Sequence, residues 1–261
     1  MELKPITVNM DDYPGELHAY LENAKLYDSS CSPNARVIFI DKDNGYFLKF
    51  AQKSSLERES AMTRYFHSKG LAAKVLTYIS DESDWLLTEK IKGDDCTAAK
   101  YLEQPERLAE TLGERLAFLH GTDYTDCPVP NHTERYLIKA KVNMETEQYD
   151  KSHFPDSFGY ESAEQDWEVV EKQGRLLKTD TLLHGDYCLP NIILDDWRFS
   201  GFIDLDSGGV GDRHIDLFWG AWTLWFNLKT DKYRDRFFDA YGRDKIDEDM
   251  LRVVAACEVF G

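Results

Sequence analysis

The sequence lacks any long hydrophobic run. Its most apolar stretch, residues 217–226, is too short to span a bilayer, which takes about 20 apolar residues, and predicts a buried helix instead. Residues 1–5 contain no apolar segment of the kind found in secretory signals. These absences lead us to expect a cytoplasmic protein with no membrane partner.

Cysteine and positive charge are also scarce. The five cysteines, at 31, 96, 127, 188 and 257, show no C-x-x-C spacing, which argues against a zinc site or a disulfide framework and fits a reducing compartment. With 31 Lys and Arg against 48 Asp and Glu, the net charge is −17. Such a chain repels nucleic acid and attracts cationic ligands, although acidic charge also serves solubility alone.

The 261 residues are 42% apolar, enough to bury a core in one two-lobed domain. The first third favours strands, which we expect at residues 35–40, 45–50, 75–79 and 85–88. The sequence Asp-Lys-Asp-Asn-Gly at 41–45 predicts a hairpin turn. Ser54 and Glu57 have the spacing of a capping box, and we expect it to open a helix that ends near Gly70.

Beyond residue 91 the pattern becomes helical. Helices are expected at residues 105–120, 133–148, 162–177, 215–228, 232–241 and 248–260, with an acidic loop at 151–164. In the first of them, leucines 108, 112, 116 and 119 share one face. The sequence therefore predicts an α+β fold, with a small β-rich N-terminal lobe (1–91) and a larger helical C-terminal lobe (92–261).

The most informative stretch is residues 182–204. Asp186 and Asn191 stand five residues apart, and Asp204 follows thirteen residues later, after two β-prone runs that flank a turn at 195–197. His-Gly-Asp alone is equally well explained by a turn at a strand end. The complete Asp, Asn and Asp set has the order of a kinase catalytic loop, in which one carboxylate accepts a hydroxyl proton and the other two side chains bind magnesium.

The first lobe contains candidates for the positive charge that a triphosphate needs. Lys49 lies in a predicted strand, and Glu59 lies in the following helix, where it can hold the lysine in place. Glu57 is the second choice for this role. Each residue taken alone is equally typical of a solvated surface, so the prediction depends on their order ahead of the Asp–Asn–Asp set.

Two further segments are candidates for binding the nucleotide. The turn at residues 29–34 contains no glycine, but its backbone amides and the Ser32 hydroxyl can meet phosphate oxygens. An ordinary Ser/Pro turn explains this segment as well. The connection at 88–91, which includes Glu89 and Ile91, is expected to line an adenine pocket through backbone groups.

Taken together, these motifs resemble those of the aminoglycoside 3′-phosphotransferases, which share the protein-kinase fold. The resemblance is most specific over residues 182–216, and it extends to further matching segments at 31–33, 56–59, 119–128 and 258–260. It implies that Asp186 is the catalytic base and that Asn191 and Asp204 bind Mg²⁺. It also implies that Lys49 contacts the α- and β-phosphates of ATP or GTP, oriented by Glu59.

The resemblance implies further roles outside that set. Ser32 would belong to a nucleotide-positioning loop, while His184 and Asp216 would shape the catalytic loop. One departure from the family pattern lies after Ile-Asp-x, where the usual Gly-Arg is replaced by Asp206 and Ser207. A cation near the triphosphate is therefore missing, and a carboxylate is added.

The implied substrate site departs from the family as well. An acidic pair that binds substrate ammonium groups in some members corresponds here to Phe226 and Asn227. Glu258 alone remains of the acidic pair at the tail, and Asp156 lies in an acidic loop that supplies further carboxylates. The resemblance makes Glu258, Asp156 and Asn227 the candidate substrate contacts.

The expected function is transfer of the γ-phosphate of ATP or GTP to a hydroxyl, at the 3′ position, of a cationic aminoglycoside. This activity confers antibiotic resistance, and we expect a monomer or weak dimer. Two alternatives remain open: a kinase of the same fold for another small alcohol, such as a sugar, a choline-like amine or a macrolide, and a non-catalytic nucleotide- or antibiotic-binding protein. A metal hydrolase built on His184 and Asp186 is excluded because further histidine ligands with suitable spacing are missing.

Overall fold

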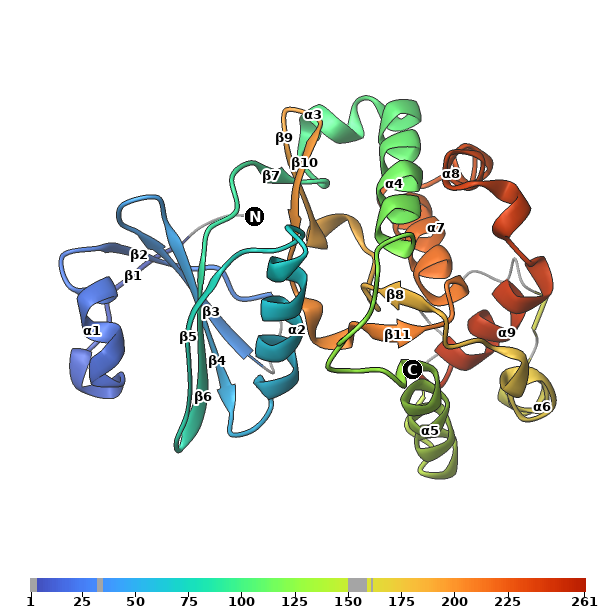
Figure 1. Ribbon diagram of the computed structural model, residues 1–261, viewed down its shortest axis with the longest axis horizontal. Helices are drawn as coiled ribbons and strands as arrows, with labels where there is room; N and C mark the ends of the chain where they lie inside the picture. Colours follow the sequence, from blue (N-terminus) through green and yellow to red (C-terminus); the bar gives the residue numbers. More distant parts are fainter. Residues whose placement is uncertain (1–3, 32–34, 150–158, 161) are drawn as a thin grey trace. The chain divides into compact units, whose positions relative to one another are not determined.

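The structure is a computed structural model that describes residues 4–31, 35–149, 159–160 and 162–261. It divides into two compact units. The first contains Met1–Lys92 together with Ser200–Asp206, and the second contains Gly93–Phe199 together with Ser207–Gly261. The first unit is rich in strands and the second in helices, so the predicted α+β class is confirmed (Figure 1).

The strands are β1 (Lys4–Ile6), β2 (Lys25–Asp28), β3 (Ala35–Asp41), β4 (Tyr46–Gln52), β5 (Val75–Ser80), β6 (Ser83–Glu89), β7 (Asp94–Asp95), β8 (Thr181–Leu183), β9 (Ile192–Asp195), β10 (Arg198–Phe202) and β11 (Gly209–Gly211). The helices are α1 (Gly15–Leu21), α2 (Glu57–Ser68), α3 (Ala99–Leu102), α4 (Pro105–His120), α5 (His132–Glu145), α6 (Ala163–Gln173), α7 (His214–Leu228), α8 (Arg234–Tyr241) and α9 (Glu248–Glu258). Short 3-10 turns lie at Met10–Asp12, Gly174–Leu176, Leu189–Asn191, Leu205–Ser207 and Arg243–Lys245.

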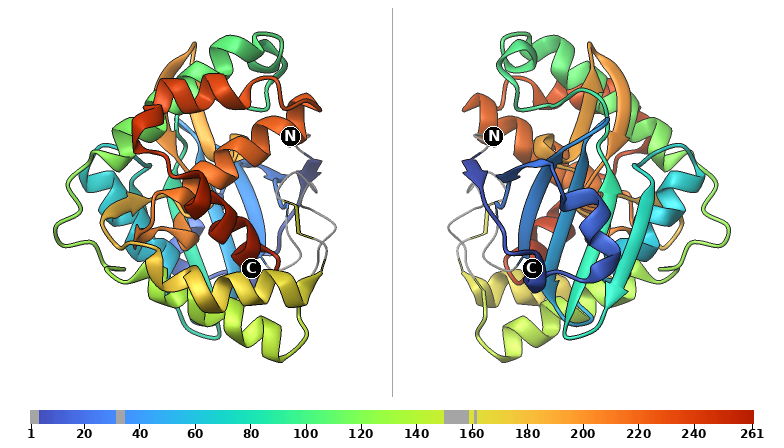
Figure 2. Two further views of the ribbon diagram at one scale, coloured as in Figure 1. Left: turned by 90° about the vertical axis from the view of Figure 1, so that its right-hand side faces the viewer. Right: turned by 90° about the vertical axis from the view of Figure 1, so that its left-hand side faces the viewer.

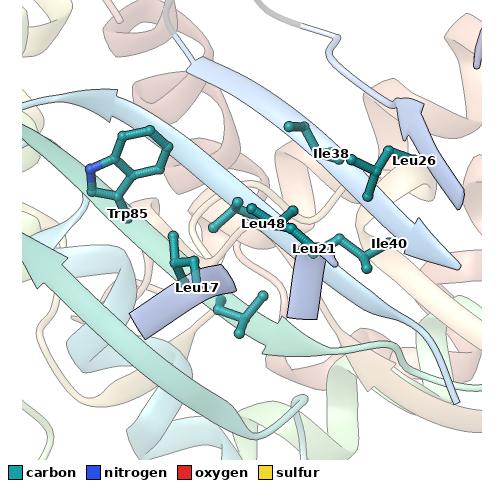
Figure 3. Packing of buried hydrophobic residues seen from close by; sticks show 8 residues of the cluster. Leu17, Leu21, Leu26, Ile38, Ile40, Leu48 and Trp85 are labelled. Atoms are coloured by element: carbon teal, nitrogen blue, oxygen red, sulfur yellow. The ribbon is translucent and has the colours of Figure 1, made fainter. Parts of the chain in front are cut away.

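The first unit is built on a six-stranded antiparallel sheet in the order β1-β2-β3-β4-β6-β5. Side chains alternate between its two faces. One face packs on α1, where Leu17 and Leu21 meet Ile38, Leu48 and Trp85 in a buried cluster (Figure 3). The right-hand view of Figure 2 shows α1 lying over this face. Helix α1 thus covers apolar strand residues that would otherwise meet water.

The opposite face of this sheet carries a smaller apolar cluster. Leu86 on β6 packs there with Val75 and with Leu56, the residue that precedes α2. The register places Lys49 of β4 directly beside Leu86. Because Leu48 points into the α1 cluster, its neighbour Lys49 points to the side of α2.

Helix α2 begins differently from the capping box that the sequence predicts. It starts at Glu57, and its N-cap is Leu56, with no side-chain cap from Ser54. Instead, the buried carboxylate of Asp84 accepts hydrogen bonds from the backbone N–H groups of Ser54 (2.9 Å) and Leu56 (2.8 Å). The capping-box prediction is therefore wrong, because a carboxylate from β6 takes over the amides that precede the helix.

The second unit is mainly helical (Figure 2). Helix α4 carries the predicted leucine face, and all four leucines are fully buried. Gly113 lets α4 approach α8 closely, because a Cβ at this position would lie 2.4 Å from the carbonyl oxygen of Phe237. This close contact anchors α8 against the central helix of the unit.

The segment between α6 and α7 forms short strands. Strand β8 pairs with β11, and β9 lies between β7 and β10 in a three-stranded sheet. Asp196 and Trp197 make the turn between β9 and β10 with positive φ angles of 49° and 67°, as in a type I′ hairpin. The predicted hairpin is therefore present, and it follows the catalytic-loop motif directly.

The predicted strands and helices correspond closely to the observed ones, whereas β1, β2, β7, β8, β11, α1 and α3 were not predicted. Most of the acidic loop expected at 151–164 lies outside the described residues. No helix in the described part of the chain is both long enough and apolar enough to cross a membrane.

Candidate active site

The loop after β8 brings two of the predicted site residues together. The Asn191 side chain donates from its amide nitrogen to the Asp186 carboxylate (2.8 Å) and to the Asp186 backbone oxygen (3.0 Å). Asn191 is buried and is the last residue of the 3-10 turn Leu189–Asn191, which has Pro190 in its first turn. Because Asn191 donates through its nitrogen, its amide oxygen is the atom available to a cation.

Asp216, at the start of α7, holds the backbone of this loop. Its fully buried carboxylate accepts from the N–H groups of His184 (2.8 Å) and Gly185 (2.7 Å) and contacts His120 Nε2 at 3.1 Å. Burial raises the pKa of Asp216, but the hydrogen bond and charge of His120 outweigh it, and the pKa lies below its ordinary value. An ionised Asp216 therefore fixes the turn from which Asp186 projects.

Gly185 is required by this arrangement. Its φ angle is +83°, and a Cβ here would lie 1.8 Å from the backbone oxygen of Ser207. Any other residue would clash with that segment. His184 is fully buried, and its Nδ1 lies 3.3 Å from the Asp186 backbone nitrogen. His184 and Asp216 thus shape the loop, as the sequence motif implies.

The other three predicted residues meet within the first unit. Lys49 Nζ lies 2.7 Å from Glu59 Oε2 and 2.7 Å from Asp204 Oδ1. Glu59 is buried in the first turn of α2, whereas Glu57 is exposed. Of the two glutamates considered, Glu59 is therefore the one that pairs with Lys49.

The charges around Lys49 keep it protonated. Burial lowers the pKa of Lys49, but the negative charges of Glu59 and Asp204 outweigh burial and raise it above its ordinary value. Asp204 itself has a φ angle of +60° and a side chain that is 52% exposed. A strained, exposed carboxylate beside a lysine suits a group that exchanges partners when a ligand binds.

Each of the two predicted metal ligands has a donor atom of the kind that magnesium binds. Asp204 offers a carboxylate and Asn191 an amide oxygen, the hard ligands that magnesium prefers. The described residues contain no group of three or more His, Cys, Asp or Glu side chains arranged to hold a metal.

The remaining nucleotide-site predictions fall on the first unit. Ser32 lies outside the described residues. Glu89 is exposed at the end of β6, and its backbone N–H donates to the backbone oxygen of Lys74 (3.0 Å). Ile91 is half-buried and packs close to Gly201, where a Cβ would lie 2.7 Å from Ile91 Cδ1.

The predicted substrate contacts are placed differently from one another. Asp156 lies outside the described residues. Asn227 is half-buried on α7 and donates to the Thr223 backbone oxygen (2.8 Å). Glu258 is buried, and its Oε1 accepts from the Tyr136 hydroxyl (2.8 Å) and from Trp219 Nε1 (3.1 Å). Internal donors thus occupy Oε1, one of the two oxygens of the carboxyl group that was expected to meet a substrate ammonium group.

Sequence reasoning missed two groups at this site. Arg58 makes a two-bond ion pair with Asp206, and His120 contacts Asp216. The sequence did contain a signal for the Arg58–Asp206 pair, namely a carboxylate at 206 that departs from the family pattern and an arginine next to Glu59. The two positions are 148 residues apart, so their contact depends on the fold.

A β-rich unit with a strand lysine held by a helix glutamate, and a helical unit with an Asp-x4-Asn loop, define a kinase-like phosphotransferase architecture. The family model described as phosphotransferase enzyme family matches residues 32–254. The chain belongs to this phosphotransferase family, as the sequence motifs predicted.

Individual proteins agree with this placement. A probable aminoglycoside 3′-phosphotransferase of Lactococcus lactis is 54% identical over 260 residues, covering 99% of both chains. The crystal structure of a type VIII aminoglycoside 3′-phosphotransferase superposes with a TM-score of 0.75 at 22% identity, covering 97% of this chain and 99% of that one. An aminoglycoside phosphotransferase of Streptomyces rimosus, in complex with ADP and streptomycin, gives a TM-score of 0.76 at 19% identity, with the same coverage. These two structures establish the fold.

Proposed function

We propose that this protein transfers the γ-phosphoryl group of ATP or GTP to a hydroxyl of an aminoglycoside, at the 3′ position, and so inactivates the antibiotic. The observation that carries the proposal is the contact of Lys49 with both Glu59 and Asp204 at 2.7 Å. The near full-length relative named as an aminoglycoside 3′-phosphotransferase supports the acceptor class.

The proposed reaction uses Asp186 as the base. A new bond forms between the acceptor oxygen and the γ-phosphorus, the bond from that phosphorus to the bridging oxygen breaks, and the nucleoside diphosphate leaves. The acceptor proton passes to the Asp186 carboxylate. Asn191 orients that carboxylate through its 2.8 Å hydrogen bond, so the geometry of the base is set before substrate arrives.

Lys49 neutralises charge on the α- and β-phosphates and moves from Asp204 to do so, while Glu59 continues to hold it. Asn191 and Asp204 would hold Mg²⁺, which when bound supplies further charge neutralisation on the triphosphate. Catalysis by such a site is mainly positioning and electrostatic stabilisation. Backbone groups near Glu89 and Ile91, and the turn that contains Ser32, would contact the nucleotide.

The acidic charge of the chain supports a cationic acceptor. A net charge of −17 attracts a polycation, and Glu258, Asp156 and Asn227 are proposed contacts for substrate ammonium groups. We further propose that the protein is cytoplasmic, a monomer or weak dimer, and has neither nucleic acid nor a membrane as partner. The same acidic charge disfavours both of those partners.

One observation favours a second candidate acceptor. Phe226, in place of an acidic residue, is 45% exposed and stacks on Trp222 with ring centroids 4.9 Å apart. Lys229 Nζ lies 4.2 Å from the centroid of the Phe226 ring. A ring and a lysine where some relatives carry carboxylates suit a less highly charged acceptor, such as a choline-like amine, a sugar or a macrolide. A panel of these alcohols beside aminoglycosides, tested with ATP and GTP, separates the two candidates.

Variants of the two aspartates test the assigned roles. We expect Asp186→Ala to lower kcat by about a hundredfold or more, because it removes the base, yet to bind nucleotide normally. Asp204→Ala should instead lose magnesium-dependent nucleotide binding, measured by calorimetry with and without Mg²⁺. Near-normal turnover in Asp186→Ala, or unchanged magnesium dependence in Asp204→Ala, would contradict the assignments.

A further inference from the structure

The contact between Arg58 and Asp206 has the geometry of a paired fork. Arg58 Nε donates to Asp206 Oδ1 at 3.1 Å, and Arg58 Nη2 donates to Oδ2 at 2.8 Å. Two parallel bonds fix the direction of both planar groups, which a single lysine contact does not do. The side chains are 30% and 43% exposed, so the pair is accessible yet partly shielded from water.

The position of the pair connects the two segments that hold Lys49. Arg58 lies next to Glu59 in the first turn of α2. Asp206 lies two residues after Asp204, in the 3-10 turn Leu205–Ser207. The fork therefore ties the helix that carries the partner of Lys49 to the turn that follows the proposed magnesium ligand.

The pair also balances charge at this point. Glu59, Asp204 and Asp206 bring three carboxylates together, and the cations that face them are Lys49 and Arg58. Without Arg58, the Asp206 carboxylate would repel an incoming triphosphate. Arg58 thus compensates on α2 for a carboxylate that the sequence places beside the metal ligand.

The two ion pairs have different fates when nucleotide binds. Lys49 leaves Asp204 for the phosphates in the proposed reaction, so that contact no longer holds the Asp204 segment. The Arg58–Asp206 fork involves neither group and is free to persist. It joins α2 to the turn after Asp204 through a contact that does not depend on Lys49, and in this way it steadies Asp204.

We infer that Arg58 and Asp206 are positioning residues for phosphoryl transfer: their ion pair holds Asp204 in register with Lys49 and Glu59 while the magnesium–nucleotide complex binds. This inference rests on the proposed function of the same site. It assigns a purpose to the Asp206 departure from the family pattern, where a glycine would leave the turn unsupported.

The test compares Arg58→Ala, Asp206→Ala and the double variant with Arg64→Ala, an exposed arginine on the same helix. We expect each single change to lower kcat/KM for magnesium–ATP by about tenfold, with the acceptor KM within about twofold of wild type. The double variant should lose no more of its kcat/KM than the more impaired of the two single variants, because either change alone already breaks the Arg58–Asp206 ion pair. Arg58→Lys should restore only part of the loss, and Arg64→Ala should match wild type.

Thermal melting without ligand separates positioning from folding. The inference is overturned if the double variant shows the product of the two single losses, if the single variants match Arg64→Ala, or if activity falls only at temperatures where the variant unfolds. Magnesium–ATP affinity, measured by calorimetry without any acceptor, gives the same comparison independently. A wild-type protein that modifies no aminoglycoside would refute the proposed acceptor, whereas weaker magnesium–ATP binding in the fork variants would still support the inference.

Discussion

Glu258 is an unusual carboxyl group at the residue scale. It is buried against Tyr136 and Trp219, both of which donate to it. Burial raises the pKa of Glu258 from 4.5 to about 7, against the opposing effect of those hydrogen bonds. The folded protein therefore retains a proton on this group at pH values where the unfolded chain has released it.

This retained proton makes stability depend on pH. Between about pH 4.5 and 7 the folded state binds more protons than the unfolded state, so the free energy of unfolding falls as pH rises. The stabilisation is complete below the unfolded pKa and is lost as pH passes the folded pKa. The total loss from this one group is on the order of 3 kcal/mol.

We therefore predict that Glu258→Gln flattens the dependence of melting temperature on pH between pH 5 and pH 8, because glutamine does not titrate. The exposed Glu171→Gln on α6 serves as the control and should keep the wild-type slope. Circular dichroism melts of the three proteins at matched ionic strength give the comparison. Equal slopes in wild type and Glu258→Gln would show that this carboxyl titrates normally.

Contacts between residues that lie close together in the sequence could be predicted from it, whereas contacts between distant residues could not. Alternation along β4 turns Lys49 away from the α1 cluster, and Glu59 follows within the next helix, so their contact was predictable from order. The contact between Arg58 and Asp206 was not predictable, because it joins positions that are 148 residues apart in the sequence. The burial of Glu258 depends likewise on helices α5 and α7, whose packing no local pattern specifies.

At the scale of elements, the start of α2 depends on a neighbouring strand. Besides the two backbone amides before the helix, the Asp84 carboxylate accepts from the Tyr78 hydroxyl (2.9 Å) and the Ser80 hydroxyl (2.6 Å). Burial raises the pKa of Asp84, but these hydrogen bonds outweigh it, so the pKa is lowered. One carboxylate thus connects β5, β6 and the start of α2.

We predict that Asp84→Ala lowers the free energy of unfolding by roughly 3 kcal/mol, because it leaves buried donors without an acceptor. Asp81→Ala, at the exposed turn between β5 and β6, should cost less than about 1 kcal/mol. Urea unfolding measures both. If the two variants lose similar stability, Asp84 does not anchor the helix.

Strong periodicity decides which elements the sequence predicts. Helix α4 spans Pro105–His120 as expected, because its leucines repeat at helical spacing and Pro105 favours the first turn. The hairpin between β3 and β4 was predicted from the turn sequence Asp-Lys-Asp-Asn-Gly at residues 41–45. Strand β11, Gly209–Gly211, was missed because glycines give little strand signal, and its pairing with β8 comes from the tertiary structure.

At the scale of the whole molecule, chain order alone suggests a single boundary near residue 91. The structure divides the chain after Lys92 but returns Ser200–Asp206 to the first unit. There the Phe202 N–H donates to the Leu71 backbone oxygen at 2.7 Å. A short segment from late in the chain thus brings Asp204 to Lys49, a long-range contact that residue spacing does not reveal.

In the proposed function, these residues serve one reaction, the transfer of a phosphoryl group to an aminoglycoside. The most direct measurement incubates the protein with magnesium and ATP or GTP and a panel of aminoglycosides, kanamycin included, and analyses the products by mass spectrometry and NMR. We predict the addition of one phosphoryl group at the 3′-hydroxyl, which is lost in Asp186→Ala and in acceptors that lack that hydroxyl. Unmodified aminoglycosides across the panel, from a protein that still binds magnesium–nucleotide, would contradict the proposed phosphoryl transfer.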